Sequence, residues 1–202
     1  KTRADAAGSV EQQLAAIERA FGDGTVSIAR GVDLQVSNLG KIYFPDDGFT
    51  KGDLMRYSAR VAPLILPVLA DRPLVLKRTP EGIAGEMFFQ QKPPDHAPSV
   101  VRIETVVNDQ GVSQPRIVGG DLATLLYTVQ IGCISVDPWF SRIDSLDSMD
   151  YAILDFDPGP RSTFDRVVEV ARWVKEELDA HGLRAAVKTS GSRGVHIAVP
   201  LP

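Results

Sequence analysis

The chain has 202 residues, 44% of them hydrophobic and 24% charged, a composition typical of a globular protein with a buried core. Its net charge of −4 excludes a protein that is basic overall, but it leaves room for a local basic patch. A single cysteine, Cys133, excludes an intramolecular disulfide, and no apolar run approaches the roughly 20 residues of a transmembrane helix. We therefore expect a cytoplasmic protein with no membrane contact.

The first half of the chain predicts two helices separated by short strands. A capping-box pattern begins a helix over residues 9–22, and a strand follows at Val32–Val36. Thr50 is a good N-cap for the second helix, in which Pro63 and Pro67 are expected to cause a kink or an end. Three further strands are predicted at Leu74–Leu76, Met87–Phe89 and Val100–Val106.

The second half continues the alternation. Asp121 is the expected N-cap of an apolar helix, and Ser162 or Thr163 caps a long amphipathic helix that Gly182 ends. Four strands are predicted at Ile134–Val136, Tyr151–Phe156, Ala185–Val187 and Val195–Val199.

This alternation predicts an α/β or α+β fold in which helices flank a mixed central sheet. Residues 1–30 are expected to form an N-terminal helical arm, and residues 31–202 the main domain. Because a strand-like segment ends only just before Pro202, we expect the C-terminal part of that domain to be missing from the chain.

Asp155 and Asp157 come at the end of the strand predicted at Tyr151–Phe156. Because residues i and i+2 of a strand point to the same side, both carboxylates are expected on one face and Phe156 toward the core. Two neighbouring carboxylates repel each other unless a cation lies between them, and Mg²⁺ and Mn²⁺ prefer oxygen ligands. The motif is also rich in turn-forming residues, so by itself it fits both a metal site and a turn capped by aspartates.

The stretch Lys188–His196 contains two glycines, two serines and one arginine. A backbone freed by glycine can wrap around a phosphate, with Ser190, Ser192 and Arg193 as donors, and His196 lies at the start of the next strand. The same composition is equally typical of an ordinary β-hairpin loop.

Basic and aromatic residues gather at the ends of elements in the first half. Lys51 falls in the first turn of the helix that Thr50 caps, where a cation is unfavourable unless an anion binds beside it. Lys77 and Arg78 end one predicted strand and Phe88–Phe89 another, a combination suited to a nucleic-acid end. Taken singly, each of these residues also fits a solvated surface or a core.

Together and in this order, the motifs resemble the polymerase domain of bacterial ligase D, in the archaeo-eukaryotic primase superfamily. The resemblance runs from about residue 31 to the end of the chain. It rests on the segments Val36–Pro45, Thr50–Asp53, Arg72–Arg78, Asp121–Leu125, Leu154–Gly159 and Lys188–His196.

The resemblance implies a primase-polymerase-like core and roles for individual residues. Asp155 and Asp157 look like metal-binding aspartates for two Mn²⁺ or Mg²⁺ ions. The residues expected to hold or lie near the incoming nucleoside triphosphate are Ser190, Ser192, Arg193, His196, Lys77 and Arg78. The residues expected to meet DNA are Asn38, Lys41 and Lys51 at a 5′-phosphate, and Phe88 or Phe89 at the template.

Two departures from the family pattern stand out. The family supplies a third metal-binding aspartate after the last motif present here, and this chain stops before that position. The family often has His-Pro-Trp where this chain has Asp137-Pro138-Trp139, so the nucleotide contact of that histidine has no counterpart here.

The function expected from this resemblance is template-dependent addition of ribo- or deoxyribonucleotides to a primer 3′-end at DNA breaks or gaps. The implied partners are gapped DNA with a 5′-phosphate, NTP or dNTP, Ku and a DNA ligase, in the cytoplasm at the nucleoid. One alternative is a catalytically incomplete module that binds 5′-phosphorylated DNA ends. A weaker one is a metal-dependent glycosyltransferase, in which the Asp-x-Asp motif would hold a nucleotide-sugar diphosphate.

Overall fold

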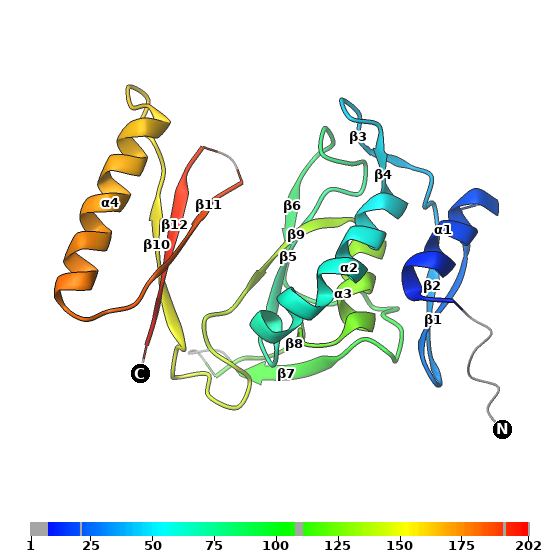
Figure 1. The fold of residues 1–202 in the computed structure, drawn as a ribbon. Helices are drawn as coiled ribbons and strands as arrows, with labels where there is room; N and C mark the ends of the chain where they lie inside the picture. The colour runs from blue at the N-terminus through cyan, green and yellow to red at the C-terminus, as the bar shows by residue number, and fades with distance from the viewer. Residues whose placement is uncertain (1–7, 21, 108–110, 192, 202) are drawn as a thin grey trace. The chain divides into compact units, whose positions relative to one another are not determined.

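The computed structural model of the chain describes residues 8–20, 22–107, 111–191 and 193–201. The helices in these ranges are α1 (Val10–Ala20), α2 (Lys51–Leu69), α3 (Leu122–Gln130) and α4 (Phe164–Ala180) (Figure 1). The strands are β1 (Gly24–Ala29), β2 (Val32–Val36), β3 (Ile42–Phe44), β4 (Phe49–Thr50), β5 (Leu74–Arg78), β6 (Phe88–Gln90), β7 (Ile103–Val107), β8 (Ser113–Ile117), β9 (Cys133–Pro138), β10 (Tyr151–Phe156), β11 (Ala186–Thr189) and β12 (Val195–Pro200). The α/β class predicted from the sequence is confirmed.

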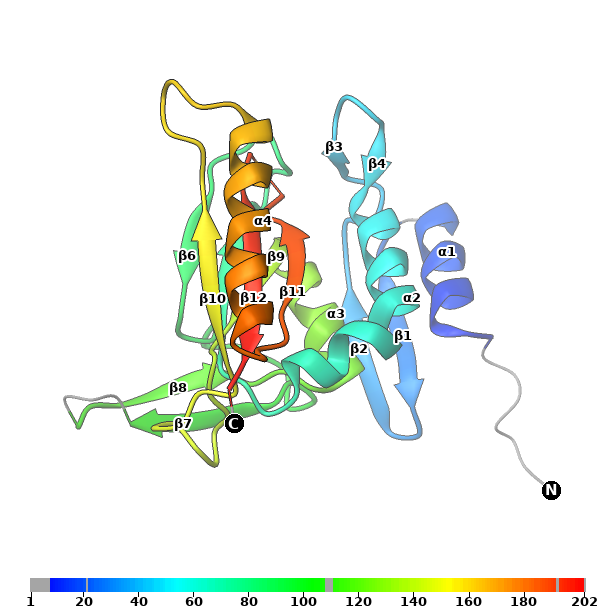
Figure 2. The same cartoon turned by 60° about the vertical axis from the view of Figure 1, so that its left-hand side comes forward.

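The strands of the described residues form several small antiparallel sheets. Three are hairpins, β1–β2, β3–β4 and β7–β8, and two are three-stranded, in the orders β6–β5–β9 and β10–β12–β11. The β7–β8 hairpin extends outward below β6 in the view of Figure 2. Strands β1, β3, β4 and β8 were not predicted from the sequence, whereas the four predicted helices are all present.

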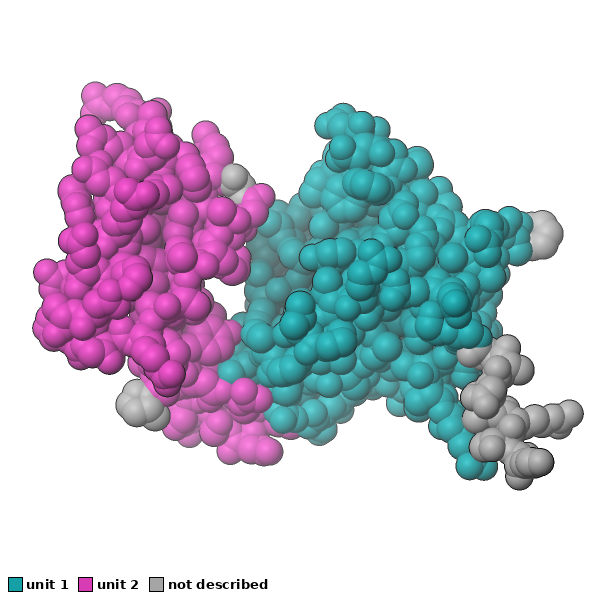
Figure 3. All heavy atoms as spheres, viewed as in Figure 1, with its two compact units in different colours: residues 1–139 teal, residues 140–202 magenta. Residues whose placement is uncertain are grey.

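The chain divides into two compact units, residues 1–139 and 140–202 (Figure 3). The division suggested by the sequence, 1–30 and 31–202, lies elsewhere. Helix α1 packs against β1 and α2 through Leu14, which is completely buried in the core of unit 1. Helix α1 and strand β1 thus contribute to the hydrophobic core of unit 1.

Unit 1 has one core, to which α1, the β1–β2 hairpin, α2, β5 and α3 all contribute. Its fully buried members include Leu14, Val26, Leu34, Leu39, Met55 and Leu126. Helix α2 begins with a capping box, in which the Thr50 hydroxyl accepts from the Asp53 backbone N–H and the Asp53 carboxylate accepts from the Thr50 N–H.

Helix α2 contains the two prolines that were expected to cause a kink or an end. Pro63 and Pro67 lie inside the helix, which continues to Leu69. Both prolines are on the exposed side, where the carbonyl groups that lose a helical partner can meet water. The absence of two backbone N–H donors therefore does not end the helix.

Unit 2 is the three-stranded sheet β10–β12–β11 with α4 along one face (Figure 1). Strand β12 alternates between buried and half-buried residues, and Val195, Ile197 and Val199 form the core with Val167 of α4. Phe156 of β10 packs against this core, as predicted. His196 and Ala198 point to the opposite face, which α4 does not cover.

Candidate functional site

In unit 2, the register of the sheet brings three polar side chains into one row. Asp155 of β10 lies opposite His196 of β12, and His196 lies opposite Lys188 of β11. The Nε2 atom of His196 is 3.3 Å from Oδ1 of Asp155. By strand alternation all three belong to the face opposite α4. Asp155 and His196, predicted from separate motifs, are therefore neighbours.

Asp157 lies against the glycine loop that joins β11 to β12. A Cβ atom added to Gly194 would overlap Oδ1 of Asp157 and would lie 2.7 Å from the carbonyl oxygen of Phe156. The loop is closed by two hydrogen bonds, from the Ser190 N–H to the Gly194 carbonyl and from the Gly194 N–H to Oγ of Ser190. The second aspartate and the predicted phosphate loop therefore meet at Gly194.

A pocket of about 420 Å³ lies between this loop and the start of α4. Its lining residues are Pro158, Ser162, Phe164, Thr189, Gly191, Arg193 and Gly194. Thr163, the N-cap of α4, makes no capping hydrogen bond through its side chain to any described residue. The positive end of the helix dipole and the Arg193 guanidinium both favour an anion in this pocket.

The structure describes some, but not all, of the residues predicted for the phosphate loop. Ser190 and Arg193 belong to the loop, whereas Ser192 lies outside the described residues. Sequence reasoning missed Thr189, and it assigned Ser162 only a capping role. Both residues line the same pocket as Arg193.

The three residues predicted to meet a DNA 5′-phosphate are brought together in unit 1. The Lys51 N–H donates to the Lys41 carbonyl, and the Lys41 N–H donates to the Asn38 carbonyl. Asn38 has a left-handed backbone with φ of 56°, and its N–H donates to Oδ1 of Asp23 at 2.6 Å. The Asn38–Lys41 turn therefore lies against Lys51 at the start of α2. We call Asn38–Lys41 together with Lys51 the 5′-phosphate turn, after its predicted ligand.

The two lysines of this turn differ in their surroundings. Lys51 is only 4% exposed, and its Nζ donates to the Ser37 carbonyl at 2.9 Å. Burial, together with the nearby Lys41 charge, lowers the pKa of Lys51 to about 8, although Asp23 opposes this shift. The Nζ of Lys41 lies on the surface and is 2.7 Å from Oε2 of Glu81. An anion would relieve the repulsion between the two ammonium groups.

Lys77, Arg78, Phe88 and Phe89 lie on the paired strands β5 and β6. Lys77 is opposite Phe89 and Arg78 is opposite Phe88, so the two basic residues point to opposite faces of the sheet. The Arg78 guanidinium lies 5.2 Å from the centre of the Phe88 ring. It also donates to the Ile131 carbonyl and to Oε1 of Gln90. Both phenylalanines are exposed and available for stacking.

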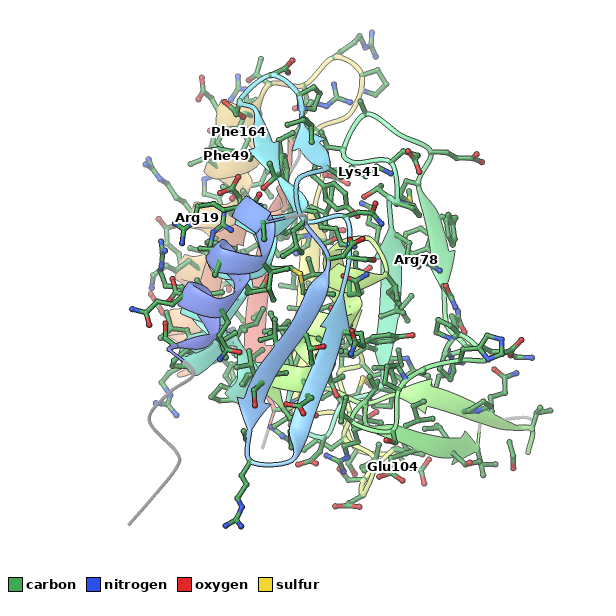
Figure 4. All side chains as sticks on the ribbon, turned by 90° about the vertical axis from the view of Figure 1, so that its right-hand side faces the viewer. Arg19, Lys41, Phe49, Arg78, Glu104 and Phe164 are labelled. Atoms are coloured by element: carbon green, nitrogen blue, oxygen red, sulfur yellow. The ribbon has the colours of Figure 1, made fainter. Side chains whose placement is uncertain are left out.

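The predicted site residues thus fall into two groups within separate units. Figure 4 labels Lys41 and Arg78 of the unit 1 group. The unit 2 group contains Asp155, Asp157 and His196. Among the described residues, no three His, Cys, Asp or Glu side chains converge as a metal cluster, so the two aspartates stand as a pair.

Comparison with known proteins identifies the family. A family model described as "LigD, primase-polymerase domain" matches residues 50–202. The chain belongs to this family.

Relatives of this LigD primase-polymerase chain include much longer proteins. The "Multifunctional non-homologous end joining protein LigD" of Pseudomonas aeruginosa is 34% identical over 180 residues, which cover 87% of this chain and 21% of the relative. The "Bifunctional non-homologous end joining protein LigD" of Bacillus subtilis is 32% identical over 168 residues, 83% of this chain and 26% of the relative. The chain therefore spans about a fifth to a quarter of the length of these curated relatives.

A solved structure agrees with the family assignment. The polymerase domain of Mycobacterium tuberculosis ligase D in complex with DNA matches with a TM-score of 0.72 and 27% identity. The match covers 83% of this chain and 61% of that one. In the described part of this LigD primase-polymerase chain, no helix is both long and apolar enough to span a membrane.

Proposed function

We propose that this chain is a template-dependent nucleotidyltransferase that adds nucleotides to a primer 3′-end at DNA breaks or gaps. The observation that carries the proposal is the arrangement at the end of β10 in a LigD primase-polymerase chain. There, Asp155 and Asp157 lie beside a glycine loop and a pocket suited to phosphate. Nucleotide addition requires carboxylates and a triphosphate site of this kind.

The residues present fit divalent metal ions. Asp155 and Asp157 are exposed oxygen ligands on one face of the sheet end, which suits Mn²⁺ or Mg²⁺. When bound there, such ions would lower the pKa of the attacking hydroxyl group and offset the charge of the leaving group. His196 lies close enough to Asp155 to orient its carboxylate.

The other residues of unit 2 would bind and orient the nucleotide. Arg193 and the first turn of α4 would hold the triphosphate in the 420 Å³ pocket. The primer 3′-oxygen would then attack the α-phosphorus in line, forming the new phosphodiester bond as the bond to pyrophosphate breaks. Holding these groups in line is the main contribution of the protein to such a step.

The DNA partner is proposed from the chemistry of unit 1. Asn38, Lys41 and Lys51 at the start of α2 suit a terminal 5′-phosphate on the far side of a gap. The solved relative carries DNA, which supports this partner. Exposed Phe88 or Phe89 would stack on a template base. The proposed substrate is NTP or dNTP. The proposed protein partners are Ku and a DNA ligase, and the proposed location is the nucleoid.

Primer extension on a gapped duplex with Mn²⁺ tests the function. We expect Asp155→Asn combined with Asp157→Asn to lower the extension rate by at least about 100-fold. The matched control is Asp144→Asn with Asp147→Asn, two exposed aspartates of the same unit, which should leave the rate unchanged. Extension at the wild-type rate by the Asp155 and Asp157 variant would refute the proposal.

A module that only recognises DNA ends is the second candidate, because all residues of the 5′-phosphate turn belong to unit 1. The same experiment separates the two functions. A wild-type chain that prefers 5′-phosphorylated gaps but never extends a primer would favour the binding module.

A further inference from the structure

The Gln130 side chain of α3 is hydrogen-bonded to Ser37, beside the 5′-phosphate turn. Gln130, the last residue of α3, accepts a hydrogen bond at Oε1 from the Ser37 N–H at 3.0 Å. Its Nε2 donates to Oγ of Ser37 at 2.8 Å. Both ends of the Gln130 amide are therefore used on one residue that lies 93 positions earlier in the chain.

Ser37 in turn contacts Lys51 and Asn38, two of the residues proposed to bind a phosphate. Its carbonyl accepts from Nζ of Lys51, and its Oγ is 3.4 Å from Nδ2 of Asn38. From the other side, Asp23 holds the N–H of Asn38. Asparagine tolerates the left-handed backbone that Asn38 adopts, and the contacts with Asp23 and Ser37 add to this local preference.

The residues after Gln130 contact the segment Thr79–Glu81, which carries the ion-pair partner of Lys41. The Gly132 carbonyl accepts from the Thr79 N–H at 2.7 Å, and a Cβ added to Gly132 would lie 2.8 Å from Cα of Pro80. Glu81 follows directly and pairs with Lys41. The turn from Gln130 to Gly132 therefore supports both lysines, one through Ser37 and the other through Glu81.

We propose that Gln130 is a positioning residue, which fixes the Ser37–Asn38 turn so that Asn38 and Lys51 meet a DNA 5′-phosphate as a preformed pair. This inference rests on the proposed function, because it names what orients the phosphate-reading residues. The Gln130 amide supplies both an acceptor for the Ser37 N–H and a donor to the Ser37 hydroxyl from one end of the side chain. Preformed groups bind more tightly because less conformational freedom is lost on binding.

The test compares two glutamines replaced by methionine, which keeps the length of the side chain but removes its hydrogen bonds. Gln130→Met removes the attachment. The matched control, Gln35→Met, removes only the hydrogen bond from Gln35 to Thr25 in the β1–β2 hairpin, two residues before Ser37. Two readouts are measured on the same full chain. One is amide hydrogen exchange, and the other is the ratio of Kd for gapped duplexes with a 5′-hydroxyl and a 5′-phosphate.

In Gln130→Met, the Leu39 and Lys41 amides should exchange at least about tenfold faster, because release of the turn weakens their hydrogen bonds to the carbonyl groups of Gly22 and Asn38. The Kd ratio should fall about fivefold, with affinity for 5′-hydroxyl DNA unchanged. Gln35→Met should alter neither readout. A merely structural role would change both affinities together and leave the ratio constant.

Wild-type exchange at Leu39 and Lys41 in Gln130→Met would overturn the inference whatever the DNA result. Faster exchange with an unchanged Kd ratio would also overturn it, because the turn would then move without consequence for the phosphate. A wild-type chain with no preference for a 5′-phosphate would refute the proposed recognition of DNA ends. The exchange readout would still decide whether Gln130 fixes the turn.

Discussion

Gly194 is a residue at which one methyl group would reach the proposed metal ligands. A side chain there would overlap the Asp157 carboxylate and crowd the Phe156 carbonyl at 2.7 Å. We expect Gly194→Ala to displace Asp157 and to lower primer extension at least about tenfold, because small misplacement of a reacting group is costly in rate. The measurement is single-nucleotide addition at saturating Mn²⁺.

Gly159 provides the matched control for this prediction. It lies two residues after Asp157, and no described atom is within 4 Å of the position that its Cβ would take. Gly159→Ala should therefore extend primers at the wild-type rate. Neither substitution should change the preference for a 5′-phosphate, which depends on residues of unit 1. Equal rates for both variants would contradict the placement of Asp157 against the loop.

Lys51 makes the recognition of a 5′-phosphate depend on pH. Its pKa of about 8 means that the buried ammonium is charged at pH 7 and largely neutral at pH 9. We expect the preference for 5′-phosphorylated DNA to fall as the pH rises through this range, although a bound phosphate moves the fall to higher pH. The charged groups near the two lysines are Asp23, beside Lys51, and Glu81, which pairs with Lys41. Replacing Lys51 by Arg should remove the pH dependence, because arginine stays charged.

The stability of the fold should change with pH in the opposite direction. The pKa of Lys51 in the folded chain is lowered from its ordinary value of 10.5, so between about pH 8 and 10.5 the unfolded chain binds more protons than the folded one. The contribution of Lys51 to the free energy of unfolding therefore rises with pH across this window. Lys51→Met should abolish that rise in denaturant titrations, which separates the effect from DNA binding.

At the scale of elements, helices α3 and α4 differ in how their N-termini are capped. Asp121, the N-cap of α3, accepts hydrogen bonds from the N–H of Thr124 at 2.8 Å and from its hydroxyl at 2.7 Å. Thr163, the N-cap of α4, makes no such side-chain bond to any residue in the described ranges. Asp121→Ala should thus lower the free energy of unfolding by about 1 kcal/mol, and Thr163→Ala by much less, in urea titrations. Equal losses would contradict the capping geometry.

The elements that could be predicted from the sequence carry strong local signals. The N-caps Thr50 and Asp121, and the apolar run Tyr151–Phe156, each define an element within a few residues. Strands β3 and β8 were missed because they carry weak local signals: β3 has only three residues, and β8 contains Pro115 and little hydrophobic alternation. Whether the prolines of α2 end the helix could not be predicted, because their exposure on the finished helix is not visible locally.

The residues of the candidate site also differ in how far the sequence could predict them. Asp155, Asp157 and the Lys188–His196 loop become candidates through the order of the motifs in the chain, because each motif by itself also fits an ordinary turn or hairpin. Gln130 could not be predicted, because a glutamine at a helix end has no local signature and its partner is 93 residues away. Lys77 and Arg78 were predicted as a pair, but neighbouring residues of a strand face opposite sides.

At the scale of the whole molecule, an acidic chain that binds DNA must do so through local positive charge. With a net charge of −4, distant residues repel the DNA backbone, and few lysines gather where a phosphate would bind. The affinity should therefore depend on a small number of phosphate contacts. Each such contact gives a slope of about 0.9 in a plot of log Kd against log salt concentration.

Replacing Lys41 by Gln should lower that slope by about 0.9 on a gapped duplex with a 5′-phosphate. The slope should not change on the same duplex with a 5′-hydroxyl, because Lys41 then has only Glu81 as its partner. The control, Lys175→Gln, removes a lysine of α4 that pairs with Asp179, and it should leave both slopes unchanged. A lower slope on both duplexes after Lys41→Gln would mean that Lys41 meets the DNA backbone in general. The acidic chain would then need a broader basic surface than the turn at the start of α2.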